Sequence, residues 1–447
     1  MRKWTLAAAT TVALLLTTQL IYASTDFAQT MQEAERGNPN AQFDLGQMYY
    51  IGRGVRQDYV QARHWYEEAA NQGDASAQII LGLMYEKGMG GRQDYAQARY
   101  WYEKAAGQGH PRAQLFLAGM YKRGEGGQQN YAQARYWYEK AANQGDAIAQ
   151  NLLGQMYENG MGGQKNYAQA RHWYEKAANQ GNAIAQYFLG QMYENGMGGR
   201  QDYAQARHWY EKAANQGDAR AQNNLGMMYY MGRGVHEDFA EARHWFEKAA
   251  NQGDASAQIG LGLLYNNGMG GRQDYAQARH WYEEAANQGD ALAQYFLGQM
   301  YEHGEGGRQD YVQARYWYEE AANQGDASAQ IGLGLLYENG MGGRQDYAQA
   351  RHWYEKAASQ GHPRAQLFLA DMYKRGEGGQ QNYAQARYWY EEAANEGDAS
   401  AQIGLGLLYE NGMGGRQDYA QARHWYEKAA SQGDADAQRY LDAMNGH

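Results

Sequence analysis

Residues 77–112 read AQIILGLMYEKGMGGRQDYAQARYWYEKAAGQGHPR, and this stretch decides the fold of the chain. The Ala-Gln dipeptide at its start returns every 36 residues without interruption. A fixed period of this size is typical of arrays that stack one small supersecondary motif. The alanines of the dipeptide are Ala41, Ala77, Ala113, Ala149, Ala185, Ala221, Ala257, Ala293, Ala329, Ala365, Ala401 and Ala437. Eleven full repeats therefore span residues 41–436.

The first half of the quoted repeat has the pattern of a helix. Asp74 is a favourable N-cap residue. Leu81, Met84 and Tyr85 follow Ala77 at i+4, i+7 and i+8, which places all four on one helical face. This apolar face predicts a first helix that packs against a neighbour.

The second half of the repeat predicts another helix. Gly88 ends the first helix, and residues 88–93 form a glycine-rich loop that tolerates positive φ angles. Asp94 caps the second helix, with Gln97 three residues later as in a capping box, and Gly109 ends it. Each repeat is therefore expected to be a helix-turn-helix pair, and the chain an all-α solenoid in which the one tryptophan per repeat fills the space between neighbours.

The first 23 residues are expected to form a cleavable signal peptide. Arg2 and Lys3 precede an apolar segment over residues 4–16, and Ala23 supplies the small residue before the cleavage site. Threonines interrupt the apolar segment before it reaches the roughly 20 residues that a membrane span needs. A mature chain that begins near Ser24 and lacks a membrane span is therefore predicted to be periplasmic or secreted.

The two ends of the array are expected to be caps, because a stack exposes the apolar face of its terminal repeats. Residues 24–40 resemble the second half of a repeat and form the N-terminal cap in this interpretation. Residues 437–447 resemble the first half and form the C-terminal cap. The chain contains no cysteine, so neither a lipidated cysteine nor a disulfide is available.

The charge of the chain argues against a nucleic-acid partner. The formal net charge is −10, and no basic tract remains after the leader to neutralise phosphates. The sequence therefore favours a protein or peptide partner, and no oligomeric state follows from it.

The residues of one repeat also match a known family. The pattern Ala-x-Ala-Gln-x-x-Leu-Gly-x-Met-Tyr-x-x-Gly-x-Gly, followed by Gln-Asp-Tyr-x-x-Ala-x-x-Trp-Tyr-x-Lys-Ala-Ala-x-Gln-Gly, resembles the Sel1-like repeat, a relative of the tetratricopeptide repeat. Residues 41–76 and 221–256 lie nearest to the family pattern, because they keep Val55 and Val235 where the other repeats have glycine. The resemblance implies a right-handed superhelix whose concave face is lined by the first helices. It also implies adaptor, signalling or host-contact roles, often in exported bacterial proteins.

Catalytic chemistry finds no support in the sequence. Cysteine-rich members of the family are described as β-lactam-binding or β-lactamase-like, so a cell-wall-associated β-lactamase-like or peptidoglycan-related activity is the alternative function. No serine of this chain is followed three residues later by a lysine, as a penicillin-recognising nucleophile requires. We therefore predict no catalytic residue, no enzyme activity and no cofactor.

A metal site is not predicted either, although histidines recur at one register. Stacked helices lie about 10 Å apart, which is too far for shared ligation at about 2 Å, and tyrosine replaces histidine in other repeats. The histidines directly before the repeat tryptophan are His64, His172, His208, His244, His280, His352 and His424.

Variation between repeats concentrates on one stripe of the first helix. The second and sixth positions after the alanine of Ala-Gln carry apolar, aromatic and amide side chains, which suit an interface with a peptide or protein. Packing between neighbouring repeats and neutral drift are the competing explanations. The residues predicted to bind the partner are Phe43, Gln47, Ile79, Leu83, Leu115, Tyr187, Gln191, Met227, Tyr295, Gln299, Leu335 and Leu367.

Overall fold

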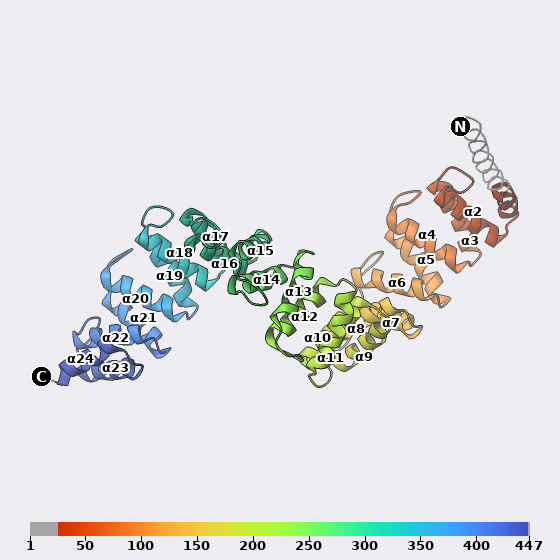
Figure 1. The fold of residues 1–447 in the computed structure, drawn as a ribbon. Coiled ribbons are helices and arrows are strands. Elements are labelled where there is room, and N and C mark those ends of the chain that lie inside the picture. The colour runs from red at the N-terminus through yellow and green to blue at the C-terminus, as the bar shows by residue number, and fades with distance from the viewer. Residues whose placement is uncertain (1–25, 446–447) are drawn as a thin grey trace, which may run out of the picture. The chain divides into compact units, whose positions relative to one another are not determined.

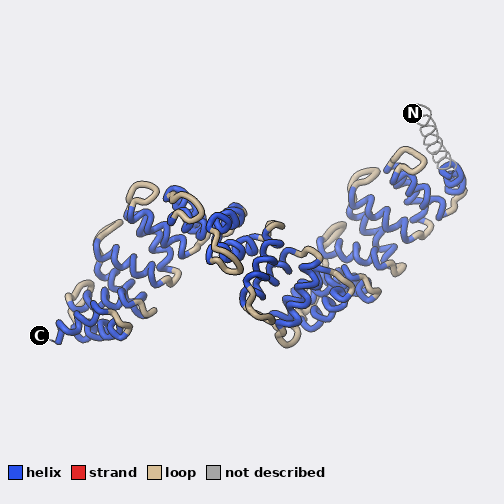
Figure 2. The backbone as a smooth tube through the Cα atoms, viewed as in Figure 1, coloured by secondary structure: helices blue, strands red, loops and turns tan. Residues whose placement is uncertain are grey.

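The computed structural model describes residues 26–445, and these residues form helices and connecting loops without a strand (Figures 1 and 2). The expected signal peptide, residues 1–23, lies outside the described residues. Residues 26–35 are helical and precede the labelled elements. The all-α solenoid expected from the period of 36 residues is confirmed.

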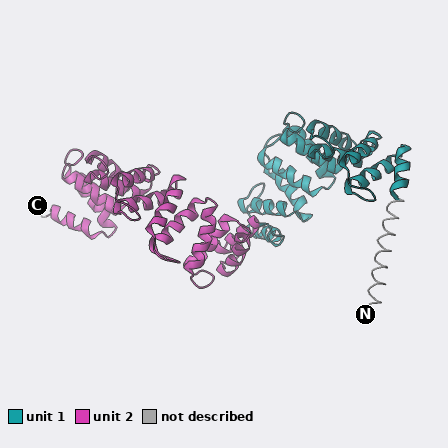
Figure 3. Ribbon diagram, turned by 90° about the horizontal axis from the view of Figure 1, so that it is seen from above, with its two compact units in different colours: residues 1–218 teal, residues 219–447 magenta. Residues whose placement is uncertain are grey.

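The chain divides into two compact units, Met1–Asp218 and Ala219–His447 (Figure 3). The first unit contains α2 (Pro39–Ile51), α3 (Tyr59–Asn71), α4 (Ala75–Lys87), α5 (Tyr95–Gly107), α6 (Pro111–Arg123), α7 (Tyr131–Asn143), α8 (Ala147–Asn159), α9 (Tyr167–Asn179), α10 (Ala183–Asn195) and α11 (Tyr203–Asn215). Within this unit each helix packs against the next one along the chain.

The second unit repeats the same arrangement. It contains α12 (Ala219–Met231), α13 (Phe239–Ala250), α14 (Ala255–Asn267), α15 (Tyr275–Asn287), α16 (Ala291–His303), α17 (Tyr311–Asn323), α18 (Ala327–Asn339), α19 (Tyr347–Ser359), α20 (Pro363–Arg375), α21 (Tyr383–Asn395), α22 (Ala399–Glu410), α23 (Tyr419–Ser431) and α24 (Ala435–Asn445). We call the even-numbered helices, whose third and fourth residues are the Ala-Gln dipeptide, A helices, and the odd-numbered ones B helices.

Local signals place the helix ends. The Asp74 carboxylate accepts a hydrogen bond of 2.6 Å from the Ala77 amide at the start of α4, and Gly88 ends that helix with a φ of 70°. Asp94 accepts from the amide of Gln97 at the start of α5, but its own amide donates to the Tyr85 carbonyl instead of to Gln97. Only half of the expected capping box therefore forms, because the loop folds back on the end of α4.

Neighbouring repeats are joined by cation–π contacts and by tryptophan. The Arg63 guanidinium of α3 lies 3.6 Å from the ring centre of Tyr85 in α4, and similar arginine–tyrosine contacts recur along each unit. Trp173 of α9 belongs to the hydrophobic cluster that contains Tyr138 of α7 and Leu153 of α8. The tryptophan is thus core packing at the junction between repeats.

A ladder of glutamine hydrogen bonds also crosses the junctions. Gln78, the second residue of its dipeptide, is buried. Its side-chain amide donates a hydrogen bond of 3.0 Å to the Ala70 carbonyl of the preceding B helix. Its side-chain oxygen accepts 2.8 Å from Gln108, which lies 30 residues later. The glutamine pair recurs within successive repeats, and the bond to the preceding B helix joins each of these repeats to the one before it, so the dipeptide satisfies buried polar groups.

One repeat lacks the glutamine pair, which gives a prediction. Glu396 stands where the ladder has glutamine, and the buried side-chain oxygen of Gln366 has no donor among residues 26–445. We expect Glu396→Gln to supply that donor and to raise the free energy of unfolding by about 1 kcal/mol, measured by urea denaturation near pH 7.

The matched control makes the reverse change in the preceding repeat, which has the complete glutamine pair. Gln360 donates 2.9 Å to Gln330, so Gln360→Glu should lower stability by a similar amount. Equal stabilities of the wild type and both variants would show that the ladder contributes nothing measurable.

The ends of the described chain cover the outermost repeats. Phe27 in the helical segment 26–35 packs against Tyr49 of α2, with ring centres 5.6 Å apart. At the other end, Leu441 of α24 shares a hydrophobic cluster with Tyr426 of α23.

Candidate functional site

The predicted stripe lies on the A helices, and its members differ in exposure. Gln47 is exposed and Ile79 is buried, whereas the remaining members are partly buried. Seven members belong to the first compact unit and five to the second. Partner contact is therefore open to most of the stripe, but not to Ile79.

The second position of the stripe packs against the B helix of the same repeat. The ring centres of Phe43 and Tyr66 lie 5.6 Å apart, and those of Tyr295 and Tyr318 lie 6.0 Å apart. One side of Phe43 and of Tyr295 is thus part of the core, which supports the competing explanation of packing for that side. The other side remains available for a partner.

Two members of the stripe pair within one helix. The Gln191 side chain in α10 donates a hydrogen bond of 2.8 Å to the Tyr187 hydroxyl, and Gln299 in α16 donates one of 2.7 Å to Tyr295. These pairs occupy i and i+4, so the amide covers the polar end of the ring. Each pair forms a patch with an aromatic body and polar rim.

Carboxylates surround the tyrosine hydroxyl in the second unit. Burial, followed by the negative charges of Asp326 and Glu302, raises the pKa of Tyr295, while the Arg364 guanidinium opposes them. The hydroxyl therefore stays protonated at neutral pH. It can donate a hydrogen bond to a partner, because its oxygen already accepts from Gln299.

The structure adds a row of exposed aliphatic side chains that the predicted stripe missed. Ile148, Ile184 and Leu292 are 54%, 45% and 44% exposed, respectively. Each stands one position before the Ala-Gln dipeptide, in the first turn of an A helix. Ile184 precedes Tyr187 by three residues, so it continues the same helical stripe. In the sequence, the position before the Ala-Gln dipeptide changes between repeats among serine, arginine and aliphatic residues, and this variation could have identified the row.

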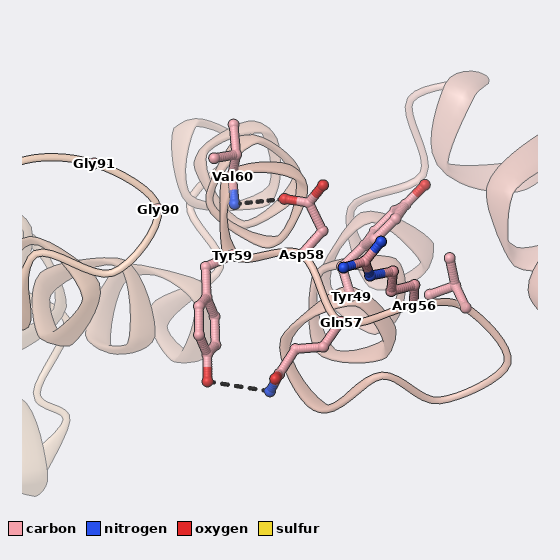
Figure 4. A pocket seen from close by; sticks show the side chains of 9 residues that line it. Tyr49, Arg56, Gln57, Asp58, Tyr59, Val60, Gly90 and Gly91 are labelled. Carbon is pink, nitrogen blue, oxygen red and sulfur yellow. Dashed lines mark hydrogen bonds between the residues drawn. The ribbon is translucent and has the colours of Figure 1, made fainter.

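A hollow of about 620 Å³ opens beside the loops of the first two repeats (Figure 4). The Gln57 side chain donates a hydrogen bond of 3.1 Å to the Tyr59 hydroxyl, and the Asp58 carboxylate accepts one of 2.9 Å from the Val60 amide. These polar groups hold the loop and cap α3, and Gly90 and Gly91 line the far side. The hollow contains no stripe residue and is explained by loop packing.

A smaller hollow of about 210 Å³ includes the stripe residue Gln47. Its other lining residues include Asp26, Asp44 and Arg53, and Arg53 forms an ion pair of 3.0 Å with Asp26. This hollow lies where the helical segment 26–35 meets α2.

The histidines at the repeated register pack against their tryptophans. His172 and Trp173, for example, have ring centres 5.2 Å apart. Within residues 26–445 no three histidine, aspartate or glutamate side chains are grouped so that they could hold a metal ion. In the same range, no helix combines the length and the apolar character that crossing a bilayer requires.

Comparison with known proteins gives a family match along nearly the whole array. The model of the Sel1 repeat matches residues 39–74, 75–110, 111–146, 147–182, 183–218, 219–254, 255–290, 291–326, 327–362, 363–398 and 399–434. These ranges begin two residues before the boundaries expected from the dipeptide, at the start of each A helix.

Two solved structures are similar to the chain in both sequence and fold. A protective antigen present in uropathogenic Escherichia coli strains, with an SLR fold, is 37% identical, and the alignment covers 94% of this chain and 90% of that one with a TM-score of 0.83. A Sel1 repeat protein from Oxalobacter formigenes is 33% identical over 69% of this chain and 89% of that one, with a TM-score of 0.56. No curated protein sequence matches significantly.

Proposed function

Because this chain belongs to the Sel1 repeat family, we propose that it is an exported scaffold that binds a protein or peptide partner through the face formed by its A helices. The tyrosine–glutamine patches at Tyr187 and Tyr295 carry the proposal. Partly exposed aromatic rings with a polar handle are frequent anchors of protein interfaces. A scaffold of this kind acts through binding alone.

Contacts between A helices support a continuous binding face. In the second unit α12 contacts α14, and α16 contacts α18, although a B helix separates each pair in the sequence. Side chains of successive A helices therefore lie close enough to meet one partner segment. The concave face implied by the family would be formed by this layer.

Export is supported by two independent features. Residues 1–23 have the pattern of a signal peptide, with residues 24–40 and 437–447 as the caps of the exported array. The similar Escherichia coli protein is described as a protective antigen, and an antigen is a molecule that the immune system meets. We therefore place this chain in the periplasm or outside the cell, in an adaptor or host-contact role.

The proposal is tested by replacing both anchor tyrosines with leucine. Leucine already stands at the same position as Leu115 and Leu367, so Tyr187→Leu with Tyr295→Leu should leave the melting temperature within a few degrees of the wild type. Partner capture by the immobilised chain from periplasmic extract or culture medium should fall several-fold, measured by quantitative mass spectrometry.

The control changes an exposed ring on a B helix instead. Tyr388→His places at that position the histidine that most repeats have there, and it should leave capture unchanged. Capture that survives the double leucine variant, or that falls equally with Tyr388→His, would rule out the A-helix face as the binding surface.

A further inference from the structure

Three side chains form a row along the starts of successive A helices in the first unit. Arg112 in α6, Ile148 in α8 and Ile184 in α10 occupy the same position in consecutive repeats, 36 residues apart. All three are exposed. Leu115 of α6 and Leu152 of α8 pack against the same hydrophobic cluster. We call Arg112, Ile148 and Ile184 the first-turn row.

The stability of the fold does not explain the first-turn row. A basic side chain in the first turn of a helix faces the positive end of the helix dipole, and isoleucines that are about half exposed gain only part of the stabilisation that full burial would give. No carboxylate lies within ion-pair distance of Arg112 in the described residues. Other repeats place a small polar residue at the same position, namely Ser76, Ser256, Ser328 and Ser400.

The start of α6 carries more positive potential than most A-helix starts. The N-cap residues of the neighbouring helices are acidic or amide residues whose side chains accept from the first-turn amides. His110 at the start of α6 makes no such bond. The unneutralised amide dipoles therefore add to the charge of Arg112.

We propose that the first-turn row binds an extended acidic peptide segment, with a carboxylate on Arg112 and two branched aliphatic side chains on Ile148 and Ile184. This inference rests on the proposed function, because it names the chemistry of the partner for part of the A-helix face. The charge complementarity is local: the chain as a whole carries −10, whereas this helix start presents an arginine without a carboxylate partner among the described residues.

The spacing of the repeats sets the spacing of the peptide. Packed helices lie about 8–10 Å apart, and a peptide in the extended polyproline II conformation advances about 3.1 Å per residue with three residues per turn, so its first, fourth and seventh side chains lie on one face. One repeat therefore corresponds to about three residues of the peptide. A glutamate at the first position with isoleucines at the fourth and seventh positions fits the row in one direction, and the reversed sequence fits it in the other.

The second unit contains a matched control for the arginine. Residues 361–390 repeat residues 109–138 with a single difference, Asp371 in place of Gly119. Arg364 is therefore the counterpart of Arg112, but the following repeats place Ser400 at that register. The aliphatic half of the row is missing there, and Asp371 adds a negative charge two helical turns away.

The experiment measures the anisotropy of two fluorescent nine-residue peptides on the purified full chain. One has glutamate first and isoleucine at its fourth and seventh positions, the other has the reversed order, and glycine and serine fill the remaining positions. We expect one of them to bind saturably. Arg112→Ser and Ile184→Ser should each weaken its affinity about fivefold, whereas Arg364→Ser should leave it unchanged.

The peptide supplies a second arm of the same experiment. Replacing its glutamate with glutamine should weaken binding to the wild type about as much as Arg112→Ser does, and should have no further effect on that variant. Serine is resident at this position in four repeats, so the protein variants are expected to fold, and circular dichroism melting checks this.

The outcomes separate the inference from the proposed function. Absence of binding by both peptides below about 1 mM, or equal losses with Arg112→Ser and Arg364→Ser, would overturn the first-turn row as an acidic-peptide site. The proposed function fails only if capture of the natural partner survives the leucine changes at Tyr187 and Tyr295. A chain that captures its partner through these tyrosines but ignores both peptides would lose the inference alone.

Discussion

Raising the pH above about 10 should unfold the array steeply, because the folded state keeps a set of B-helix tyrosines buried and neutral. Burial raises the pKa of Tyr138 from 10.0 to about 12, with the Arg123 charge opposing the shift. Burial is likewise the largest cause of the raised pKa of the equivalent tyrosines, which are Tyr66, Tyr102, Tyr174, Tyr282, Tyr318, Tyr354, Tyr390 and Tyr426.

Carboxylates strengthen this dependence in most repeats. The Tyr354 hydroxyl, for example, donates a hydrogen bond of 2.8 Å to the Glu338 carboxylate of the preceding A helix. Losing the hydroxyl proton would remove this bond and place two negative charges side by side. The neutral phenol is therefore required by the packing of the A helix on the B helix.

The direction of the pH effect follows from the proton balance. An unfolded tyrosine loses its proton near pH 10, so above that pH the unfolded state binds fewer protons than the folded state. The stabilisation is fully present below pH 10 and is lost as the pH rises towards each folded pKa. Between its unfolded and folded pKa, each buried tyrosine lowers the free energy of unfolding by about 1.4 kcal/mol per pH unit. Several such tyrosines lie in one cooperative segment, so their effects add.

The measurement is a pH titration from 8 to 12 that records helical circular dichroism and tyrosinate absorbance together. The two signals should change together for the buried tyrosines. Phe246 occupies the same site in one repeat, so Tyr318→Phe is tolerated by the fold and should move the midpoint to higher pH. Ionisation of every tyrosine with the helical signal intact would contradict the expected coupling.

Gly342→Ala should destabilise the second unit by about 2–5 kcal/mol. Gly342 has a φ of 71°, which costs an alanine about 1–2 kcal/mol. A Cβ atom there would lie 2.3 Å from the Tyr311 carbonyl oxygen of the preceding repeat, so backbone must also move, at a further cost of about 1–3 kcal/mol.

A second glycine with the same backbone conformation isolates the crowding. Gly361 has a φ of 83°, but a Cβ atom there would meet nothing within 4 Å. Gly361→Ala should therefore lower the free energy of unfolding only by the cost of placing an alanine in the left-handed conformation, about 1–2 kcal/mol. Urea denaturation of both variants gives the comparison, and equal losses would mean that the loop does not dock tightly on the preceding B helix.

Half of the candidate site could be predicted from the sequence. The varying second and sixth positions identified the tyrosine–glutamine pairs, because residues four apart on a helix are neighbours whatever surrounds them. Exposure could not be predicted in the same way. Ile79 and Leu115 occupy the same register in consecutive A helices, but Ile79 is buried and Leu115 is only partly buried, because they pack among different side chains.

The sequence by itself determined the repeat, its two helices and their ends. Asp74, Asp94 and Gly88 act on backbone groups a few residues away, so their effect is complete within one repeat. The period of 36 residues then required stacking, because a pair of short helices cannot bury its apolar face alone.

Only the tertiary structure decided how one repeat meets the next. It showed that the Gln78 side chain donates a hydrogen bond to the Ala70 carbonyl of the preceding repeat, and that the Arg63 guanidinium occupies the space beside Gly91, where a Cβ atom would lie 2.3 Å from it. Such choices depend on atoms that come together only when separate helices pack, and no local propensity encodes those distances.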